Sequence, residues 1–297
     1  MQAEPSSSST GSVIHDIGYR NYDGERLSPG AIERSLLALS TRHAVGIGRS
    51  VKAKLAPAAL TLAACLPPIV MVMFAVLTGA PNLPVTPESY LNSISVLIAL
   101  FVASAAPPLL SRDLRHRIVT LYFSRPPTRT SYVRARVFAL IIVTFLFMFV
   151  PLLVLFLGAL GAELDLRQQL EHFLRAVLSA ALLAVSLGVL CSLISSLTQR
   201  RGIGVAVIVA TLLVLTGVQA TVQQILDTTG HQSGADLSAV ISPFAHVRAI
   251  GFHLFDADVG LFRRSTSHGL LLLALWAAMY GVLSFLLVRR YRSVAAS

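Results

Sequence analysis

The sequence runs Val137-Phe-Ala-Leu-Ile-Ile-Val-Thr-Phe-Leu-Phe-Met-Phe-Val-Pro-Leu-Leu-Val-Leu-Phe-Leu-Gly-Ala-Leu-Gly-Ala162 through 26 consecutive residues that carry no charge. A helix needs about 20 apolar residues to cross the hydrocarbon core of a bilayer, so this run is long enough. Pro151 inside it does not exclude a helix, because prolines are tolerated in helices within the membrane. The whole chain is 55% hydrophobic and 13% charged, which is outside the range of soluble globular proteins. The sequence therefore predicts an all-α membrane protein.

Five further runs have the same character, so we predict six transmembrane helices. None of the six contains an acidic, basic or histidine side chain, and each can insert at little electrostatic cost. Proline pairs at Pro67-Pro68 and Pro107-Pro108 remove backbone donors, so the first two spans are expected to be kinked. A transmembrane domain is thus expected over residues 55–288, with a short tail over residues 289–297. The predicted spans are Leu55–Gly79, Ser89–Leu110, Val137–Ala162, Ala176–Thr198, Ile203–Ile225 and Gly269–Val288.

Basic residues alternate along the chain with the predicted spans. Nineteen of the 24 lysines and arginines fall before span one, between spans two and three, between spans four and five, or after span six. Cytoplasmic flanks retain positive charge, so both termini are expected in the cytoplasm, and the start of the chain has no cleavable signal pattern. The positions of the basic residues are explained by membrane topology. The sequence has no basic, aromatic-rich domain that could recognise nucleic-acid bases. We therefore expect the bilayer, and no nucleic acid, as their partner.

The region before the first span divides into two parts. Residues 1–28 are Ser-rich and then turn-rich, which predicts a disordered cytoplasmic segment. Residues 29–54 have helical periodicity and predict a helix that lies in the membrane interface, with a solvated helix as the alternative. Glu33 on the apolar side, with Gly46 and Gly48, weakens this interpretation. The apolar positions are Ile32, Leu36, Ala44, Ile47 and Val51.

A basic segment, Ser111–Arg136, connects spans two and three. Apolar positions at i, i+4, i+7 and i+8 predict a short amphipathic helix from Arg112 to Phe123, which Pro126-Pro127 would end. Two functions remain open for this helix: an interfacial anchor with snorkelling arginines, or a coupling helix that docks into a cytosolic partner. The apolar positions are Leu114, Ile118, Leu121 and Tyr122, and the arginines that face away are Arg112, Arg115 and Arg117.

The connection between spans five and six, Leu226–His268, is about 43 residues long and contains two apolar stretches. We expect short re-entrant or interfacial helices here, because backbone at membrane depth must be helical or buried. His246 and His253 would share a helical face, but two imidazoles without a third nearby ligand are more typical of packed or solvated histidines than of a metal site. Cys65 and Cys191 lie inside apolar runs, where they are expected to pack like alanine or serine.

No catalytic or cofactor-binding pattern is visible in the chain. Neither of its two lysines stands in the Gly-x4-Gly-Lys-Ser/Thr order that a phosphate-binding loop needs, so ATP hydrolysis would require a separate subunit. Proton-coupled transporters usually bury ionisable groups in their spans, and these spans contain none. The span serines have no histidine or carboxylate partner within the spans, which argues against an intramembrane enzyme.

A few polar side chains near the span ends are weak candidates for a substrate path. They suit a hydrophobic or amphipathic cargo such as a drug, a lipid or a peptide, but the same residues could merely bond neighbouring helices. These candidates are Asn92, Ser95, Thr216, Gln219 and Gln223.

The basic connection contains a recognisable pattern: Asp113, Thr120-Leu-Tyr-Phe123, Ser124-Arg-Pro126, Arg129, Tyr132 and Arg134. This pattern resembles the one after the second span in the permease subunits of bacterial type-2 ABC exporters, whose six-span chains work with a separate ATPase. A six-span layout and Ser242-Pro243-Phe244 add to the resemblance, and residues 14–27 are similar to those of actinobacterial members. The chain departs from the family at Asp113, where glutamate is more common, and at His116-Arg117, where glycine is common.

The resemblance implies a permease in a bacterial plasma membrane. Its implied partners are an ATP-binding-cassette ATPase subunit, which holds ATP and magnesium, and a second permease copy or a paralogue that completes a dimer. The alternative is a non-transporting anchor or assembly subunit that recruits a cytosolic partner through the same segment. Coupling to the ATPase would fall to Arg112, Asp113, Leu114, Arg115, Arg117, Ile118, Tyr122, Arg125 and Pro126.

Overall fold

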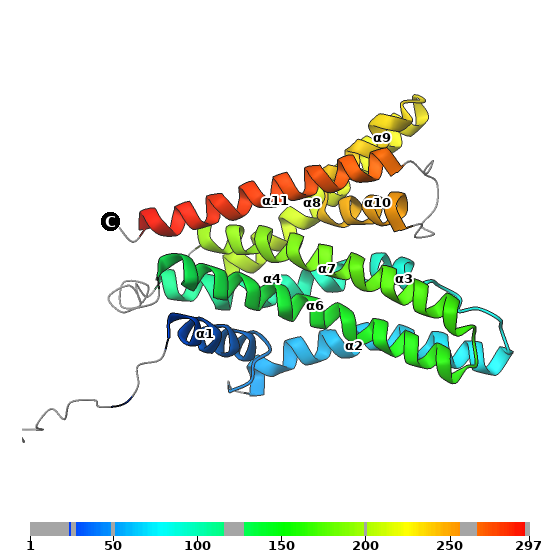
Figure 1. Cartoon of the computed structure of the whole chain (residues 1–297), viewed down its shortest axis with the longest axis horizontal. Coiled ribbons are helices and arrows are strands. Elements are labelled where there is room, and N and C mark those ends of the chain that lie inside the picture. The colour runs from blue at the N-terminus through cyan, green and yellow to red at the C-terminus, as the bar shows by residue number, and fades with distance from the viewer. Residues whose placement is uncertain are drawn as a thin grey trace, which may run out of the picture.

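A computed structural model describes Gly24 and residues 28–48, 51–115, 128–198, 201–255 and 266–294. Every regular element in these ranges is helical, as the sequence predicts (Figure 1). The elements are α1 Pro29–Ala44, α2 Val51–Thr78, α3 Pro87–Ser93, α4 Ser95–Arg115, α6 Arg129–Gly161, α7 Leu166–Leu197, α8 Arg201–Thr228, α9 Gln232–Ser238, the 3-10 turn η1 Ala239–Ile241, α10 Pro243–Phe255 and α11 Thr266–Val294.

Five of the described helices are long and apolar enough to cross a membrane, and they agree with predicted spans one, three, four, five and six. A sixth crossing is obtained if the bent pair α3 and α4 counts as one span. The fold is therefore an all-helical bundle of the kind expected for a membrane protein. The apolar helices cover Lys54–Thr78, Thr130–Gly161, Leu166–Leu197, Gly202–Thr228 and Ser267–Tyr291.

Span two was expected to be kinked at its proline pair, and the structure places the break of this span elsewhere. The chain bends by 62° between α3 and α4, at Ile94, whereas the helix continues through Pro107 and Pro108. The hydroxyl of Ser93, just before the break, donates to the carbonyl of Ser89 at 3.1 Å. Serine bonds to the carbonyl four residues earlier often bend helices. Thr86 caps the start of α3 by accepting from the backbone N–H of Ser89.

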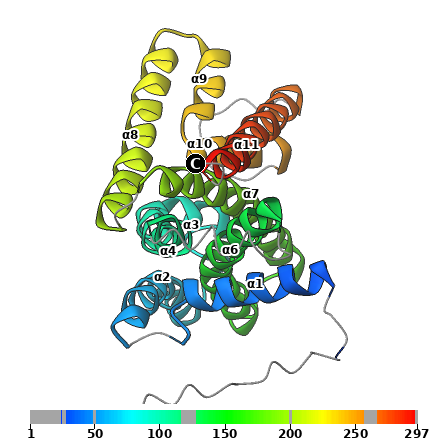
Figure 2. The same ribbon diagram turned by 90° about the vertical axis from the view of Figure 1, so that its left-hand side faces the viewer.

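Helix α1 runs across one end of the bundle, whereas α6 and α7 run along it (Figure 2). Leu36, Ser40 and Ala44 on one face of α1 are buried against the bundle. The predicted helix of residues 29–54 is divided, because α1 ends at Ala44 and α2 begins at Val51. Gly46 and Gly48 between them have φ of 85° and 80°, a left-handed conformation that glycine adopts without strain.

Helices α6 and α7 form the centre of the bundle, with α1 and α2 on one side and α8, α10 and α11 on the other (Figures 1 and 2). Close approach of α6 and α7 depends on Gly188, where an added Cβ would overlap the Cγ1 of Ile141. Gly158 of α6 likewise leaves no room for a Cβ beside Val72 of α2. Small residues of this kind let helices pack tightly when lipid provides no hydrophobic drive between them.

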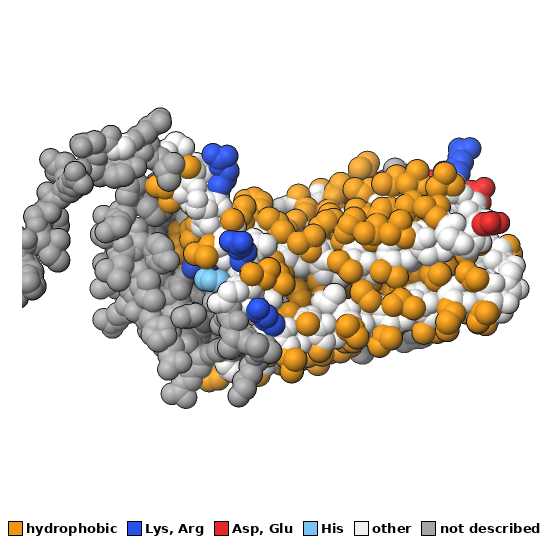
Figure 3. Space-filling view, turned by 90° about the horizontal axis from the view of Figure 1, so that it is seen from below, with side chains coloured by type: hydrophobic (Ala, Val, Ile, Leu, Met, Phe, Trp, Pro, Cys, Tyr) orange, Lys and Arg blue, Asp and Glu red, His pale blue; other side chains and the backbone are white. Residues whose placement is uncertain are grey.

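The flank that carries α2 is covered by hydrophobic side chains, and charged side chains gather at the two ends (Figure 3). We call one end the basic end: it holds α1, the last turn of α4, the first turns of α6, and the last turns of α7 and α11. The other end holds α3, α9, α10 and the turn between α6 and α7 (Figure 1). An apolar flank with charged ends is the pattern that a bilayer imposes on a helical bundle.

Candidate functional site at the basic end

The predicted coupling segment begins inside α4. Residues Arg112 to Arg115, which include Asp113 and Leu114, form the last turn of this helix, which is continuous from Ser95. The predicted helix from Arg112 to Phe123 is thus described only over its first four residues, which are helical and continue α4. The other predicted coupling residues, Arg117, Ile118, Tyr122, Arg125 and Pro126, lie outside the described residues.

The chain returns to the bundle at Thr128, the N-cap of α6. Its Oγ1 accepts a hydrogen bond from the backbone N–H of Ser131 at 3.2 Å and also bonds the hydroxyl of Ser131 at 3.0 Å. An N-cap of this type satisfies one of the free amides at a helix start. Helix α6 thus starts at Arg129, eight residues before the predicted span at Val137. Both α4 and α6 therefore extend beyond their apolar runs, and residues 116–127 connect them.

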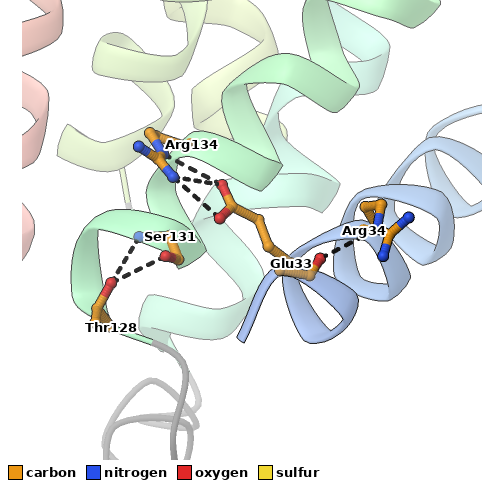
Figure 4. A network of polar contacts seen from close by, with 6 residues as sticks. Glu33, Arg34, Thr128, Ser131 and Arg134 are labelled. Atoms are coloured by element: carbon orange, nitrogen blue, oxygen red, sulfur yellow. Dashed lines mark hydrogen bonds and ion pairs between the residues drawn. The ribbon is translucent and has the colours of Figure 1, made fainter. Parts of the chain in front are cut away.

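An ion pair fastens α1 to the first turns of α6 (Figure 4). The guanidinium of Arg134 donates from Nη2 to both carboxylate oxygens of Glu33 at 3.0 Å, and from Nε to Oε1 at 3.2 Å. Glu33 is the residue that weakened the sequence interpretation of α1, and the pair explains its position. Bidentate arginine–carboxylate pairs have a fixed geometry, which makes them the strongest of the exposed ion pairs.

Two further contacts tie α11 to the same end. Tyr132 of α6 and Tyr291 of α11 are buried with ring centroids 6.1 Å apart, and the guanidinium carbon of Arg136 lies 5.3 Å from the centre of the Tyr132 ring. Arg290 of α11 donates from Nε to the backbone carbonyl of Ser196 on α7 at 3.1 Å. Tyr132 and Arg134 were matched residues of the sequence motif, and they connect α6 to two other helices.

These contacts join α1, α6, α7 and α11 at the basic end, where residues 116–127 connect α4 to α6. We call this set of joined helices the braced frame. Helix α1 is bonded to α6, α6 contacts α11, and α11 is bonded to α7. No protein-family model matches the chain, and no curated protein matches it at a significant level. The candidate site therefore depends on this geometry and on the residues themselves.

Reversing the charge of Arg134 or Glu33 should loosen α1. We expect Arg134→Glu or Glu33→Arg to lower the free energy of unfolding by up to about 1 kcal/mol, as for exposed ion pairs, and the double swap to recover most of it. Trypsin cleavage at Arg42, which is exposed on α1, measures the loosening directly. The more exposed pair Arg167–Glu171, 3.6 Å apart, is the control and should show almost no coupling. Equal coupling in both pairs would contradict a special role for the Glu33–Arg134 pair.

The predicted substrate-path residues of α8 are engaged in bonds within the chain. Thr216 lies 3.1 Å from the hydroxyl of Ser242, just before α10, and donates to the carbonyl of Leu212 at 2.8 Å. Gln219 is buried and donates from Nε2 to the Oε1 of Gln223 at 2.7 Å. Their positions fit the alternative that polar residues in these spans bond neighbouring groups. The Ser242 contact also joins two features that were singled out separately in the sequence.

Asn92 and Ser95 lie on either side of the bend between α3 and α4. Asn92 lines a crevice between α3, α7 and α10, whose volume of about 30 Å³ holds only one or two water molecules. Ser95 is half-buried and does not line it. The crevice beside Asn92 is therefore too small for a substrate.

The same crevice is lined by a buried carboxyl side chain, Glu88, that the sequence interpretation missed. The Oε1 of Glu88 on α3 lies 3.3 Å from the Nδ1 of His172 on α7, and Glu88 is 4% exposed. Glu88 Oε2 and Arg248 Nε, on α10, have no hydrogen-bond partner among the described residues, and both residues line the crevice. Burial lowers the pKa of Arg248. Glu88 stands one residue before the predicted second span, so a search limited to the spans could not find it.

The long connection forms the short helices that were expected, α9 and α10. His246 is buried and its Nε2 lies 3.0 Å from the carbonyl of Leu272, while His253 Nε2 lies 3.7 Å from Asp236 Oδ2. Burial lowers the pKa of His246, and the bond to Leu272 acts in the opposite direction. Burial also lowers the pKa of His253, while Asp236 acts to raise it. No group of three metal-ligating side chains is present among the described residues.

Acid should weaken this packing. The pKa of His246 is lowered in the folded state, so the stability it contributes is complete above the unfolded value of about 6.5 and is lost as the pH falls through the folded value. We expect the midpoint temperature of unfolding to decrease as the pH is lowered from 7.5 to 5. His246→Gln keeps a donor for Leu272 and cannot be protonated, so it should reduce the fall, with His253 responsible for the rest. His231→Gln, at an exposed site, is the control. An unchanged pH slope in His246→Gln would contradict the assignment.

Proposed function

We propose that this chain is the membrane permease subunit of an ATP-driven exporter, with the basic end in the cytoplasm and a hydrophobic or amphipathic cargo. The observation that carries the proposal is the pair of helix extensions at the basic end. Helices α4 and α6 both continue beyond their apolar runs, and residues 116–127 join them. These residues include most of the segment that resembles the coupling motif of type-2 ABC exporters.

In this proposal ATP and magnesium bind a separate ATP-binding-cassette subunit, because the chain lacks the phosphate-binding lysine motif. Closure of the ATPase dimer would press on residues 116–127 and move the ends of α4 and α6. The braced frame of α1, α6, α7 and α11 would carry this movement into the bundle. A second permease copy or a paralogue would form the other half of the translocation path.

A non-transporting anchor or assembly subunit is the second candidate. Two observations favour it. Thr216, Gln219 and Gln223 are hydrogen-bonded within the chain, and the crevice beside Asn92 has room only for water. These residues therefore provide no path for cargo through a single copy. In that case the basic end would recruit a cytosolic partner without moving cargo. Cargo-stimulated ATP hydrolysis distinguishes the two candidates, because only a transporter links cargo binding to the motor.

Affinity purification of the tagged chain from its native host tests the proposal. We expect a nucleotide-hydrolysing subunit to co-purify, and we expect the partner to be lost when residues 116–127 are replaced by a Gly-Ser linker of the same length. A control linker in the opposite connection, over residues 256–265, should leave the partner bound. Absence of any nucleotide-hydrolysing partner in both preparations would overturn the exporter proposal. Retention of the partner by the first linker variant would overturn the coupling role of the segment.

A further inference from the structure

A large apolar groove runs along α2, on the flank that is seen in Figure 3. Its volume of about 850 Å³ falls in the range of clefts that hold small molecules, about 300–1,000 Å³. Helices α2, α4 and α6 form it, with Leu62 and Leu66 on α2 and Leu146 and Val150 on α6 among its lining residues. Lys54 is the one charged residue among the fifteen that line the groove. None of the predicted path residues contributes to it.

The charge lies at one end of the groove. Lys54 is exposed in the first turn of α2, beside the turn after α1 that supplies Val45 and Ile47 to the lining. The lining continues along α2 to Ile69, which is about 22 Å further at 1.5 Å per residue. One leaflet of hydrocarbon is about 15 Å thick, half of the bilayer core. The groove thus starts at the membrane surface of the basic end and reaches past the middle of the bilayer.

We propose that this groove binds an anionic membrane lipid, with an acyl chain along α2 and α6 and the headgroup at Lys54. Lipid tails are as apolar as leucine, so a tail gains little by exchanging bulk lipid for the groove. The groove can then distinguish one lipid from another only by the headgroup. One basic residue near a membrane surface favours an anionic headgroup by about 1 kcal/mol, which is about a fivefold preference.

A second copy of the chain fits the groove less well. A two-fold contact places the same patch of both subunits together. The groove would then bring two copies of Lys54 into one interface, and none of its fifteen lining residues is acidic. A phosphate-bearing lipid supplies the missing negative charge. This inference does not depend on the exporter proposal, because it needs neither a motor nor cargo.

Photo-crosslinking in lipid nanodiscs tests the inference on the full chain. The probes are phosphatidylglycerol and phosphatidylcholine that carry the same diazirine in the acyl chain, each diluted into phosphatidylcholine. We expect phosphatidylglycerol to label the groove residues of α2 and α6 about fivefold more than phosphatidylcholine, and the preference to vanish in Lys54→Gln. Arg289→Gln removes an exposed charge on α11 at the same end and should keep the preference.

A second variant tests the groove itself. Ala58 is exposed and lines the groove next to Lys54, so Ala58→Trp fills the space without disturbing the core and should reduce labelling by both probes. Ala56→Trp, at an exposed position outside the lining, is its control. Equal labelling by the two probes, or a preference that survives Lys54→Gln, would overturn the inference. Crosslinks between two copies through Leu62→Cys in a Cys65→Ser background, with the groove protected from both probes, would assign it to a second copy instead.

Discussion

A methyl group added at Gly188 is expected to destabilise the bundle by about 1–3 kcal/mol, the usual cost of overpacking a core. Gly188 lies where α7 approaches α6, and a Cβ there would overlap the Cγ1 of Ile141 and lie 3.4 Å from its Cα and N. The Cγ1 could move aside only by rotation about the Cα–Cβ bond of Ile141, and a β-branched side chain in a helix strongly prefers one such rotamer. Thermal unfolding of Gly188→Ala in detergent micelles measures the effect.

Two variants make this prediction specific. Gly217→Ala adds the same methyl group to α8, where nothing lies within 4 Å of the new Cβ, and should not lower the unfolding midpoint, because alanine is the better helix former. Ile141→Ala removes the obstructing Cγ1, so it should rescue Gly188→Ala beyond the sum of the two single effects. Destabilisation by Gly217→Ala of the same size, or a strictly additive double variant, would show that the α6–α7 contact is not the cause.

Replacement of Tyr122 by alanine should uncouple transport from ATP hydrolysis while the complex stays assembled. Tyr122 lies outside the described residues, and the prediction rests on its place in the apolar pattern of the segment 111–123. Truncating a central aromatic anchor of an interface costs about 2 kcal/mol or more, roughly 30-fold. We expect losses of this size in cargo efflux and in cargo-stimulated ATP hydrolysis of the reconstituted complex. Arg125→Ala should act in the same direction.

His116→Ala is the matched control for Tyr122, since position 116 lies opposite the apolar positions on a helical projection of the segment. It should transport like the unaltered chain. Unchanged efflux and unchanged ATP hydrolysis in both Tyr122→Ala and Arg125→Ala would remove the main support for a coupling helix. Loss of the partner subunit would instead show that the segment serves assembly, as in the anchor alternative.

Uncharged runs predicted the long helices well, because a helix that crosses a bilayer needs about 20 consecutive apolar residues. They did not predict where the helices end. Helix α6 starts eight residues before its apolar run, and α7 begins at Leu166, ten residues before the predicted Ala176. Hydropathy marks the part of a helix that suits lipid, whereas capping at Thr128 and Asp165 sets where the helix begins.

Contacts between distant residues were beyond the reach of sequence patterns. Glu33 and Arg134 are 101 positions apart, and Glu88 and His172 are 84 positions apart, so no local sequence spacing predicts either pair. The candidate site shows the same limit. Tyr132 and Arg134 were singled out by a motif, but their partners on α11 and α1 became visible only in the folded chain. The weak path candidates were chosen by polarity alone, and polarity does not distinguish a bonded side chain from a free one.

The central pair of helices is much longer than a bilayer is thick. Helix α6 has 33 residues and α7 has 32, which is about 50 Å each, against a hydrocarbon core of about 30 Å. The two helices must either tilt or project from the membrane on both sides. Because α6 and α7 approach closely at Gly188, we expect a change in bilayer thickness to tilt them together. Such a tilt would move the basic end, where α6 is joined to α1 and α11.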